Sequence, residues 1–379
     1  MSDSSNFFDL VVKKIAEMQI KGYTWRQIAD DLNAEYGKSY DESTYRKKYN
    51  AIESKGEFFQ GDTFLELSKL RVKARDERTQ TNANIRRLSR EETIKEIAHD
   101  YARQMSDKKI LEVPETTIDT SGGDGWALLN IGDWHYGLII DNYWNKYDVS
   151  IAKDRISKLI VQVRDNCWRH GVKHLVINGL GDYISGNIHL PLRLNSQEDV
   201  ISQVMDVSEV LAEMLSLLSK YFYIDCYTVY GNHGRVTPDK KESLNLENFE
   251  RIIEWYLSSR LKDNPRVNIN MTTDCTGDMV VYDVKGWHIG LIHGDKDKVS
   301  KATSNMTLMT RQPFDLIITA HKHHFSADET NGCMVIANPS LMGVDDYAKD
   351  LRVTSYPAQT LIIVGDKSPV ECMYYIRLD

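Results

Sequence analysis

The stretch "FDLIITAHKHH", residues 314–324, joins an apolar run to three histidines within four positions. A short apolar run of this kind is typical of a buried strand. In folds that alternate strands and helices, ligands bind in the crevice beyond the strand ends. We therefore expect this strand to end at a binding site, where histidines separated by one residue are available as ligands.

Four further runs share this pattern, because each is apolar in its centre and ends in Gly, Asp, Asn or His. They are "WALLNIGDWH" (126–135), "VKHLVINGLGD" (172–182), "IDCYTVYGNH" (224–233) and "WHIGLIHGD" (287–295). Helical patterns at 196–220 and 246–261 separate several of these runs. The alternation predicts an α/β layered fold.

The strand ends carry residues that bind metal ions. Asp133 and His135 are two positions apart, so on an extended chain their side chains point to the same side. Asp182 follows a strand, and Gly181 before it gives the backbone room to turn. Other donors are Asn232, the adjacent His233, which should face another direction, and His293, His321 and His323.

One strand-end histidine alone would indicate no more than a satisfied polar residue, but here seven or eight nitrogen and oxygen donors share the same placement. Donors of this kind suit divalent manganese, iron or zinc. The five cysteines are scattered without CxxC spacing, which argues against a thiolate zinc site. We therefore expect any metal to be held by His, Asp and Asn.

The order of the blocks, D-x-H, G-D, G-N-H, H-G and H-x-H, resembles the calcineurin-like metallophosphoesterases. The resemblance extends over roughly residues 125–379, with the blocks running from Asp133 to His323. It implies an α/β fold, a β-sandwich flanked by helices, with a dinuclear metal centre at the strand ends. The ions implied are manganese first, with iron, zinc or magnesium as alternatives.

The resemblance also assigns roles to individual residues. Asp182 would bridge the two ions, and His233 would be the catalytic imidazole beside the leaving group instead of a ligand. One metal would be held by Asp133, His135, Asp182 and His323, and the other by Asp182, Asn232, His293 and His321. His321 and His323 would thus each reach one of two neighbouring ions, and His324 would lie outside the ligand set.

Two positions depart from the family pattern. The residue after the G-N-H block is usually Asp or Glu, which in many members hydrogen-bonds the catalytic histidine, whereas here it is Gly234 followed by Arg235. The last block has Ala320 where Gly is usual. Neither change removes a ligand, but the first leaves the orientation of His233 open.

The region before the strands divides by composition. Residues 1–57 predict three short helices that resemble a helix-turn-helix domain, 58–110 a basic helical arm, 111–125 a linker and 126–379 the phosphoesterase domain. Such a helical head on a metallophosphoesterase resembles bacteriophage and prophage proteins. No apolar run is long enough to span a membrane and no signal peptide is evident, so we expect a cytoplasmic protein, in the bacterial host if it is phage-encoded, with no membrane partner.

Charge is distributed unevenly along the chain. The net charge is −8, but residues 67–90 hold eight basic and two acidic residues, so the remainder carries −14. DNA is the expected partner, contacted by Arg46 and Lys47 of the third helix and by Arg71, Arg75, Arg86 and Arg87 of the arm. Alternatively, the three helices form a bundle that binds protein. The arm would then be a solvated helix or would join two copies of the chain.

Three functions fit these observations. The first is phosphodiester hydrolysis by a DNA nuclease similar to the repair exonucleases of this family. The second is a phosphodiesterase or phosphatase for small nucleotides or phosphoproteins, and the third is a DNA-binding regulatory or scaffolding protein with a structural metal site. Candidate substrate-binding residues are His189, Arg193, Asn195 and Arg235, and Ser340 and Tyr347 are weaker candidates for lining the same crevice.

Overall fold

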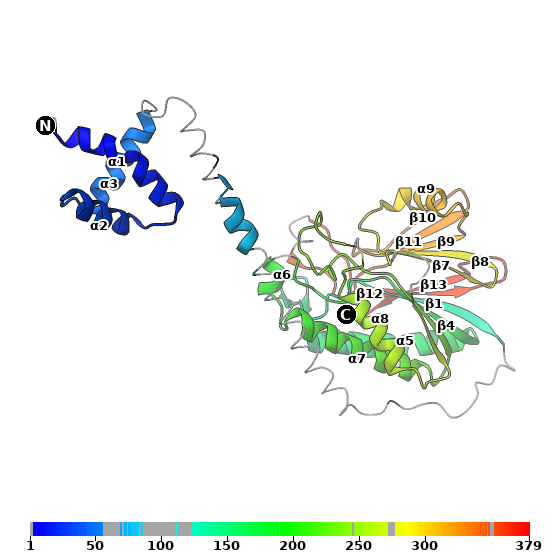
Figure 1. Ribbon diagram of the computed structural model, residues 1–379. Helices are drawn as coiled ribbons and strands as arrows, with labels where there is room; N and C mark the ends of the chain where they lie inside the picture. Colours follow the sequence, from blue (N-terminus) through cyan, green and yellow to red (C-terminus); the bar gives the residue numbers. More distant parts are fainter. Residues whose placement is uncertain are drawn as a thin grey trace. The chain divides into compact units, whose positions relative to one another are not determined.

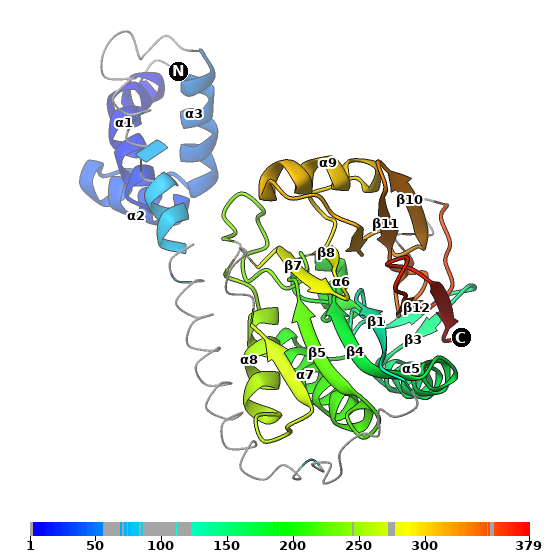
Figure 2. The same cartoon turned by 90° about the vertical axis from the view of Figure 1, so that its right-hand side faces the viewer.

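The computed structural model describes residues 3–55, 69, 72–73, 75–82, 85, 111, 123–188, 190–244, 246–271, 277–346, 348 and 352–379 (Figures 1 and 2). Contacts divide the chain into two units, Met1–Asp100 and Tyr101–Asp379, and each is described by itself. Among the described residues, no helix combines the length and apolar character needed to cross a bilayer.

Three helices form the start of the first unit: α1 (Asp3–Ile20), α2 (Trp25–Tyr36) and α3 (Glu42–Lys55). Thr24 caps α2 in a reciprocal capping box with Gln27, and Gly37 ends the helix in the left-handed conformation. The three helices bury one shared core, which includes Ile15, Leu32 and Tyr45. The predicted all-helical start of the chain is therefore confirmed.

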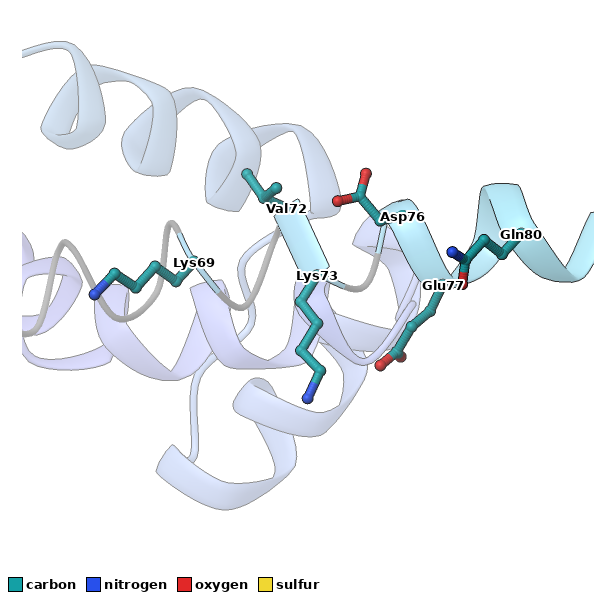
Figure 3. Close-up of a pocket in the computed structure, with 6 residues that line it drawn as sticks. All are labelled: Lys69, Val72, Lys73, Asp76, Glu77 and Gln80. Carbon is teal, nitrogen blue, oxygen red and sulfur yellow. The ribbon is translucent and has the colours of Figure 1, made fainter.

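The arm is helical over residues 75–82. A hollow of about 530 Å³ lies along its surface, lined by Lys69, Val72, Lys73, Asp76, Glu77 and Gln80 (Figure 3). All six residues come from the arm, and none is a histidine or cysteine that could act as a nucleophile or soft metal ligand. Arg75 is exposed on the same helix, whereas Arg71, Arg86 and Arg87 lie outside the described residues.

Two sheets form the centre of the second unit. The six-stranded sheet has the order β13 (Cys372–Arg377), β12 (Ala358–Val364), β1 (Gly125–Ile131), β4 (Val172–Gly179), β5 (Tyr223–Thr228) and β6 (Val267–Asn270). The five-stranded sheet has the order β10 (Ser326–Thr330), β11 (Cys333–Ala337), β9 (Leu316–Thr319), β8 (Trp287–Ile292) and β7 (Met279–Val284). The five runs predicted as strands correspond to β1, β4, β5, β8 and β9.

The two sheets pack face to face over one apolar core. Leu128, Val176 and Ile362 of the six-stranded sheet contact a cluster that includes Leu291 and Ile318 of the five-stranded sheet. All four residues of β9 are buried, which explains why this strand is continuously apolar instead of alternating. The predicted β-sandwich is confirmed.

Helices cover the outer faces of the sandwich (Figure 2). The helices α5 (Val149–Arg169), α7 (Val200–Leu218) and α8 (Glu250–Arg260) lie along the six-stranded sheet, and α9 (Val299–Thr310) contacts β10 and β11. The short helix α6 (Leu190–Leu194) and the hairpin of β2 (Ile140–Asp141) and β3 (Lys146–Tyr147) belong to the connections. The α/β fold class with flanking helices is therefore confirmed.

Candidate metal centre

The donors converge because of strand direction. β1, β4 and β5 are parallel neighbours in one sheet, and β8 and β9 are parallel neighbours in the other. The carboxyl ends of parallel strands lie at one edge of a sheet, so the loops that follow them meet. These loops carry Asp133 and His135, Asp182, Asn232 and His233, His293, and His321 and His323.

One cluster consists of Asp133, His135 and His323, whose ligand atoms lie within 4.8 Å of one another. The two imidazole Nε2 atoms, of His135 and His323, are 3.2 Å apart. His323 Nε2 is 3.8 Å from Asp133 Oδ1. The family resemblance assigns these residues to one metal, and the structure brings them together.

A second cluster consists of Asp182, His293 and His321, again within 4.8 Å. His293 Nε2 lies 3.1 Å from Asp182 Oδ2 and 3.1 Å from Asn232 Oδ1. His293 Nδ1 donates a hydrogen bond to the carbonyl oxygen of Leu180 at 2.7 Å, which directs Nε2 towards the cluster. Backbone carbonyls orient metal-binding imidazoles in this way.

Asp182 lies between the two groups, because it also clusters with His135 and His233. This position matches the bridging role that the resemblance implies. The geometry alone would also let His233 act as a ligand, so its catalytic role stays a prediction.

The buried polar atoms fit divalent cations. Asp133 Oδ1 is buried without a hydrogen-bond partner, and Asp182 Oδ2 is buried 3.1 Å from His293 Nε2. An unpaired buried carboxylate oxygen is costly unless a cation compensates it. Asp, Asn and His side chains are suitable ligands for such ions, so the chain fits a two-metal site.

Burial keeps most of the imidazoles neutral, which is their metal-binding form. Desolvation lowers the pKa of His321 to about 4 and that of His323 to about 3, and it holds the pKa of His135 well below its usual range. His293 differs: burial opposes its protonation, but Asp182 and Asp133 outweigh this effect and raise its pKa to about 10. Burial acts to raise the pKa of Asp182, but the attraction of the nearby histidines outweighs burial. This attraction holds the pKa of Asp182 well below its usual range.

The expectation that Asp133 and His135 share one side of an extended chain was wrong. Both have left-handed backbones, with φ of 50° and 45°, and so do Asp182, His321 and His323 at 52°, 65° and 58°. Non-glycine residues in this region carry strain that the surrounding structure must offset. Tight turns beyond the strand ends, and not strand pleating, aim these side chains.

Hydrogen bonds between loops hold these turns. The backbone amide of His321 donates to Asp133 Oδ2 at 2.8 Å, and Ser340 Oγ donates to the carbonyl oxygen of Asp133 at 2.8 Å. Ser340 is fully buried, and its hydroxyl supports the Asp133 turn; that it lines the crevice stays a prediction. Tyr347 lies outside the described residues.

Glycine is required where the β4 and β5 loops touch. Gly181 has a φ of +80°, and a Cβ there would collide with the backbone nitrogen of Gly231. A Cβ on Gly231 would in turn collide with Asp182 Oδ1. This contact allows the loops of Asp182 and Asn232 to approach each other.

His233 is oriented by a backbone carbonyl. Its Nδ1 lies 2.9 Å from the carbonyl oxygen of Ser185, which can only accept, so Nδ1 carries the proton. The His233 amide also donates to Asp182 Oδ1 at 2.7 Å. The role that many family members give to the acid after the histidine is therefore filled by Ser185.

Two residues at the start of α8 were missed by the sequence reasoning. Asn248 Nδ2 donates to the carbonyl oxygen of Gly231 at 2.8 Å, and Glu250 accepts hydrogen bonds from the backbone amides of Tyr183 and Gly231. Burial and repulsion from Asp182 raise the pKa of Glu250 to about 7, and these two amides oppose the rise. In sequence, an acid in the first turn of a helix indicates only a favourable dipole interaction.

The structure places the remaining predicted residues as follows. Arg193 and Asn195 are exposed, and the Asn195 carbonyl accepts a hydrogen bond from Ile139 at 2.7 Å. Arg235 is half-buried beside Asn248, and its Nε is buried without a partner. Arg46 and Lys47 are exposed on α3, and His189 lies outside the described residues.

Comparisons with known proteins agree with this geometry. The calcineurin-like phosphoesterase family matches residues 127–325, and the YonJ N-terminal domain matches residues 4–61. The SPbeta prophage-derived uncharacterized protein YonJ of Bacillus subtilis (strain 168) is 24% identical over 382 aligned residues, covering 94% of this chain and 93% of that protein. The predicted resemblance to prophage proteins is therefore confirmed.

Several solved structures are also similar. An archaeal phosphodiesterase matches with 12% identity and a TM-score of 0.32, covering 66% of this chain and 99% of that chain. Vps29 complexed with zinc from Entamoeba histolytica matches with 12% identity and a TM-score of 0.33, covering 67% and 99%. The phosphoesterase Yfce from E. coli matches with 12% identity and a TM-score of 0.31, covering 66% and 100%.

The family match covers more than half of the chain and spans the converging donors. The chain therefore belongs to the calcineurin-like metallophosphoesterases and carries a YonJ N-terminal domain ahead of its metal-dependent phosphoesterase domain.

Proposed function

We propose that this phosphoesterase is a nuclease that hydrolyses phosphodiester bonds of DNA. The observation that carries the proposal is the arrangement of two donor clusters around Asp182, with His233 beside them. This arrangement suits hydrolysis by water, with no side chain needed as nucleophile. The ions proposed are two Mn²⁺, and Fe²⁺, Zn²⁺ and Mg²⁺ are the alternatives.

Two bound cations supply a water of lowered pKa and clamp the phosphoryl oxygens during in-line displacement. The protein supplies the rest. One ion would be held by Asp133, His135 and His323. The other ion would be held by Asn232, His293 and His321. Asp182 would bind both ions. His233, with Nδ1 bound to Ser185, would donate a proton to the leaving oxygen through Nε2, a contribution of about 100- to 10,000-fold.

A pair of exposed aromatic residues supports a substrate with bases. Tyr143 is 92% exposed and Trp144 is 56% exposed, and their rings meet edge to face at the tip of the β2–β3 hairpin. Asn142 in this tip donates to Asp346, and the neighbouring Asp345 lies within electrostatic reach of His233. Aromatic rings beside such a site are suited to stack on unpaired bases.

The first unit supports a large substrate. Exposed Arg46 and Lys47 on α3 would contact phosphates, and the basic arm would add further contacts or join two copies of the chain. Manganese-dependent assays on single-stranded, nicked and linear DNA, RNA, cyclic nucleotides and phosphopeptides test the proposal. We expect cleavage of DNA that His233→Ala abolishes while the metal content is unchanged.

One observation favours a second candidate, a phosphodiesterase for small nucleotides. Asp345 and Asp346 place negative charge beside the site, which disfavours a long polyanion more than a single nucleotide. Selective turnover of cyclic nucleotides, with all DNA substrates left intact, would establish this candidate and refute the nuclease.

A further inference from the structure

A buried carboxylate joins the two loops that present the central donors. Glu250 is 2% exposed at the first position of α8. Its Oε1 accepts from the backbone amide of Tyr183 at 2.7 Å, and its Oε2 accepts from that of Gly231 at 2.6 Å. Tyr183 follows Asp182 and Gly231 precedes Asn232, so one side chain bonds next to a donor in each loop.

Asn248 completes this connection. Its Nδ2 donates to the carbonyl oxygen of Gly231 at 2.8 Å, and its Oδ1 accepts from the backbone amide of Glu250 at 2.9 Å. Both backbone polar groups of Gly231 are therefore held, one by Asn248 just before α8 and the other by Glu250, the first residue of α8. The Tyr183 bond also fixes the start of the segment whose Ser185 carbonyl orients His233.

Packing alone does not explain why a carboxylate occupies position 250. Glu250 is buried and is repelled by the nearby Asp182, so a neutral side chain of similar volume would be less costly to bury. What a carboxylate offers is two acceptor oxygens for two fixed N–H donors. A backbone N–H group can only donate, so each of the two amides needs an acceptor oxygen. No other side chain of this length provides two acceptor oxygens.

We propose that Glu250 is a positioning residue of the metal centre, which sets the spacing of Asp182 and Asn232 by bonding both of their loops. It acts through the backbone and is not a ligand. Asn248 and Glu250 together occupy the space that the family's usual acid at position 234 would need, because a Cβ on Gly234 would collide with Asn248 and approach Glu250 Cγ to 2.9 Å.

The same helix provides a matched control one turn later. Glu254 is 3% exposed and accepts from Thr228 Oγ1 at 3.2 Å and from the hydroxyl of Tyr230 at 2.6 Å. Hydroxyl groups rotate and both donate and accept, so they adapt to an amide at position 254. Backbone amides do not, so Glu250→Gln leaves one backbone amide without its acceptor and Glu254→Gln leaves none.

The experiment compares the full-length wild type with Glu250→Gln and Glu254→Gln. The readouts are manganese stoichiometry and affinity, the spin-coupled EPR signal of a manganese pair, and turnover of bis(p-nitrophenyl) phosphate. Losing a bond that orients a metal site typically costs about 10- to 100-fold in affinity or activity. We expect that loss, and a weakened pair signal, for Glu250→Gln alone, with metal-free unfolding alike in both variants.

Glu250→Asp serves as a second test, because it keeps the charge but is one methylene too short to reach both amides. It should lower manganese affinity as Glu250→Gln does, and it tests the inference if Glu250→Gln does not fold. A Glu250→Asp or Glu250→Gln protein with wild-type manganese affinity and pair signal would overturn the inference, as would an equal loss in Glu254→Gln. The readouts do not depend on which phosphoester is the natural substrate.

Discussion

Single residues at this site combine strain with function. Five of the predicted ligands, Asp133, His135, Asp182, His321 and His323, have a positive φ. A left-handed backbone costs about 1 kcal/mol for each such residue, and bonds between the loops offset this cost. The donor positions are thus preorganised by backbone contacts as well as by side-chain packing.

The first residue-scale prediction concerns the bridge. Asp182→Asn keeps the volume but removes the charge shared by both clusters, so manganese content should fall below two ions per chain. Turnover should fall by more than the roughly 100-fold that is typical for losing an outer hydrogen-bond partner. Metal analysis with turnover of bis(p-nitrophenyl) phosphate checks both effects, and a protein that retained two tightly bound ions would contradict the bridging role.

The second residue-scale prediction concerns the family's acid. Gly234→Asp restores the usual residue after the histidine, yet we expect it to reduce stability and activity. Its Cβ would displace Asn248, whose amide group is engaged on both sides. Overpacking of this kind costs about 1–3 kcal/mol. Thermal unfolding and turnover measure the effect, and increased activity would show that the site has room for the acid.

At the scale of elements, the β2–β3 hairpin is anchored by hydrogen bonds, although the aromatic side chains at its tip are exposed. Asn145 in the tip donates to the carbonyl oxygens of Met342 and Val344 at 2.7 and 3.0 Å. The buried guanidinium of Arg155 donates to Asn145 Oδ1 at 3.0 Å and to the carbonyl oxygen of Met342 at 2.7 Å. An anchored hairpin loses less backbone freedom on binding than an unattached loop would.

The element-scale prediction concerns the two aromatic residues at this tip. Replacing Tyr143 and Trp144 together by Ala should weaken binding of single-stranded DNA, because stacking contributes about 1–3 kcal/mol per base. Turnover of bis(p-nitrophenyl) phosphate should be unchanged, and phenylalanine at both positions should restore binding. An abasic oligonucleotide is the control, and it should bind the double-alanine variant and the wild type equally well. If the double substitution weakens binding of the abasic oligonucleotide as much as binding of ordinary single-stranded DNA, stacking is excluded.

At the scale of the whole molecule, charge is distributed unevenly along the chain. The basic residues 67–90 contrast with a remainder of charge −14, so any affinity for nucleic acid should come mainly from the first unit. The domain limits and the DNA contacts stay predictions, because the described structure contains no partner. The helical packing shows that α3 presents Arg46 and Lys47 to solvent.

The salt dependence of DNA binding tests this distribution. Replacing Arg46 and Lys47 by Ala should reduce the slope of log K against log salt by about 0.9 for each phosphate that the variant no longer neutralises. Hydrolysis of a small phosphoester should not change. Fluorescence anisotropy over a range of salt concentrations measures the slope, and an unaltered slope would favour a protein-binding role for the three helices.

Metal removal tests the whole fold. The buried oxygens Asp133 Oδ1 and Asp182 Oδ2 would gain cation partners when metal binds, so chelation should lower the melting temperature. A ligand present at about a hundredfold its Kd stabilises the native state by about 2.7 kcal/mol. His233→Ala should keep the manganese-dependent shift, because His233 is predicted not to be a ligand. Loss of the shift in that variant would make His233 a ligand.

The sequence was sufficient for the fold class and for the choice of donors. Strand ends such as "IGDWH" and "ITAHKHH" combine an apolar run with polar groups, and this local pattern survives folding because buried strands need apolar residues. It did not identify β7, β11 or β12, nor β6, β10 and β13, which are short or partly exposed. Strands of this kind carry little periodic signal.

By itself, the sequence determined which atoms are available: carboxylate, amide and imidazole donors at the ends of apolar strands, with no thiolate pair to compete. Only the tertiary structure decided how they are held. The Ser185 carbonyl orients His233, Glu250 joins the Asp182 and Gly231 loops, and Gly234 leaves space for Asn248. Such contacts join residues far apart in the chain through loop conformation, so no local pattern of residue types encodes them.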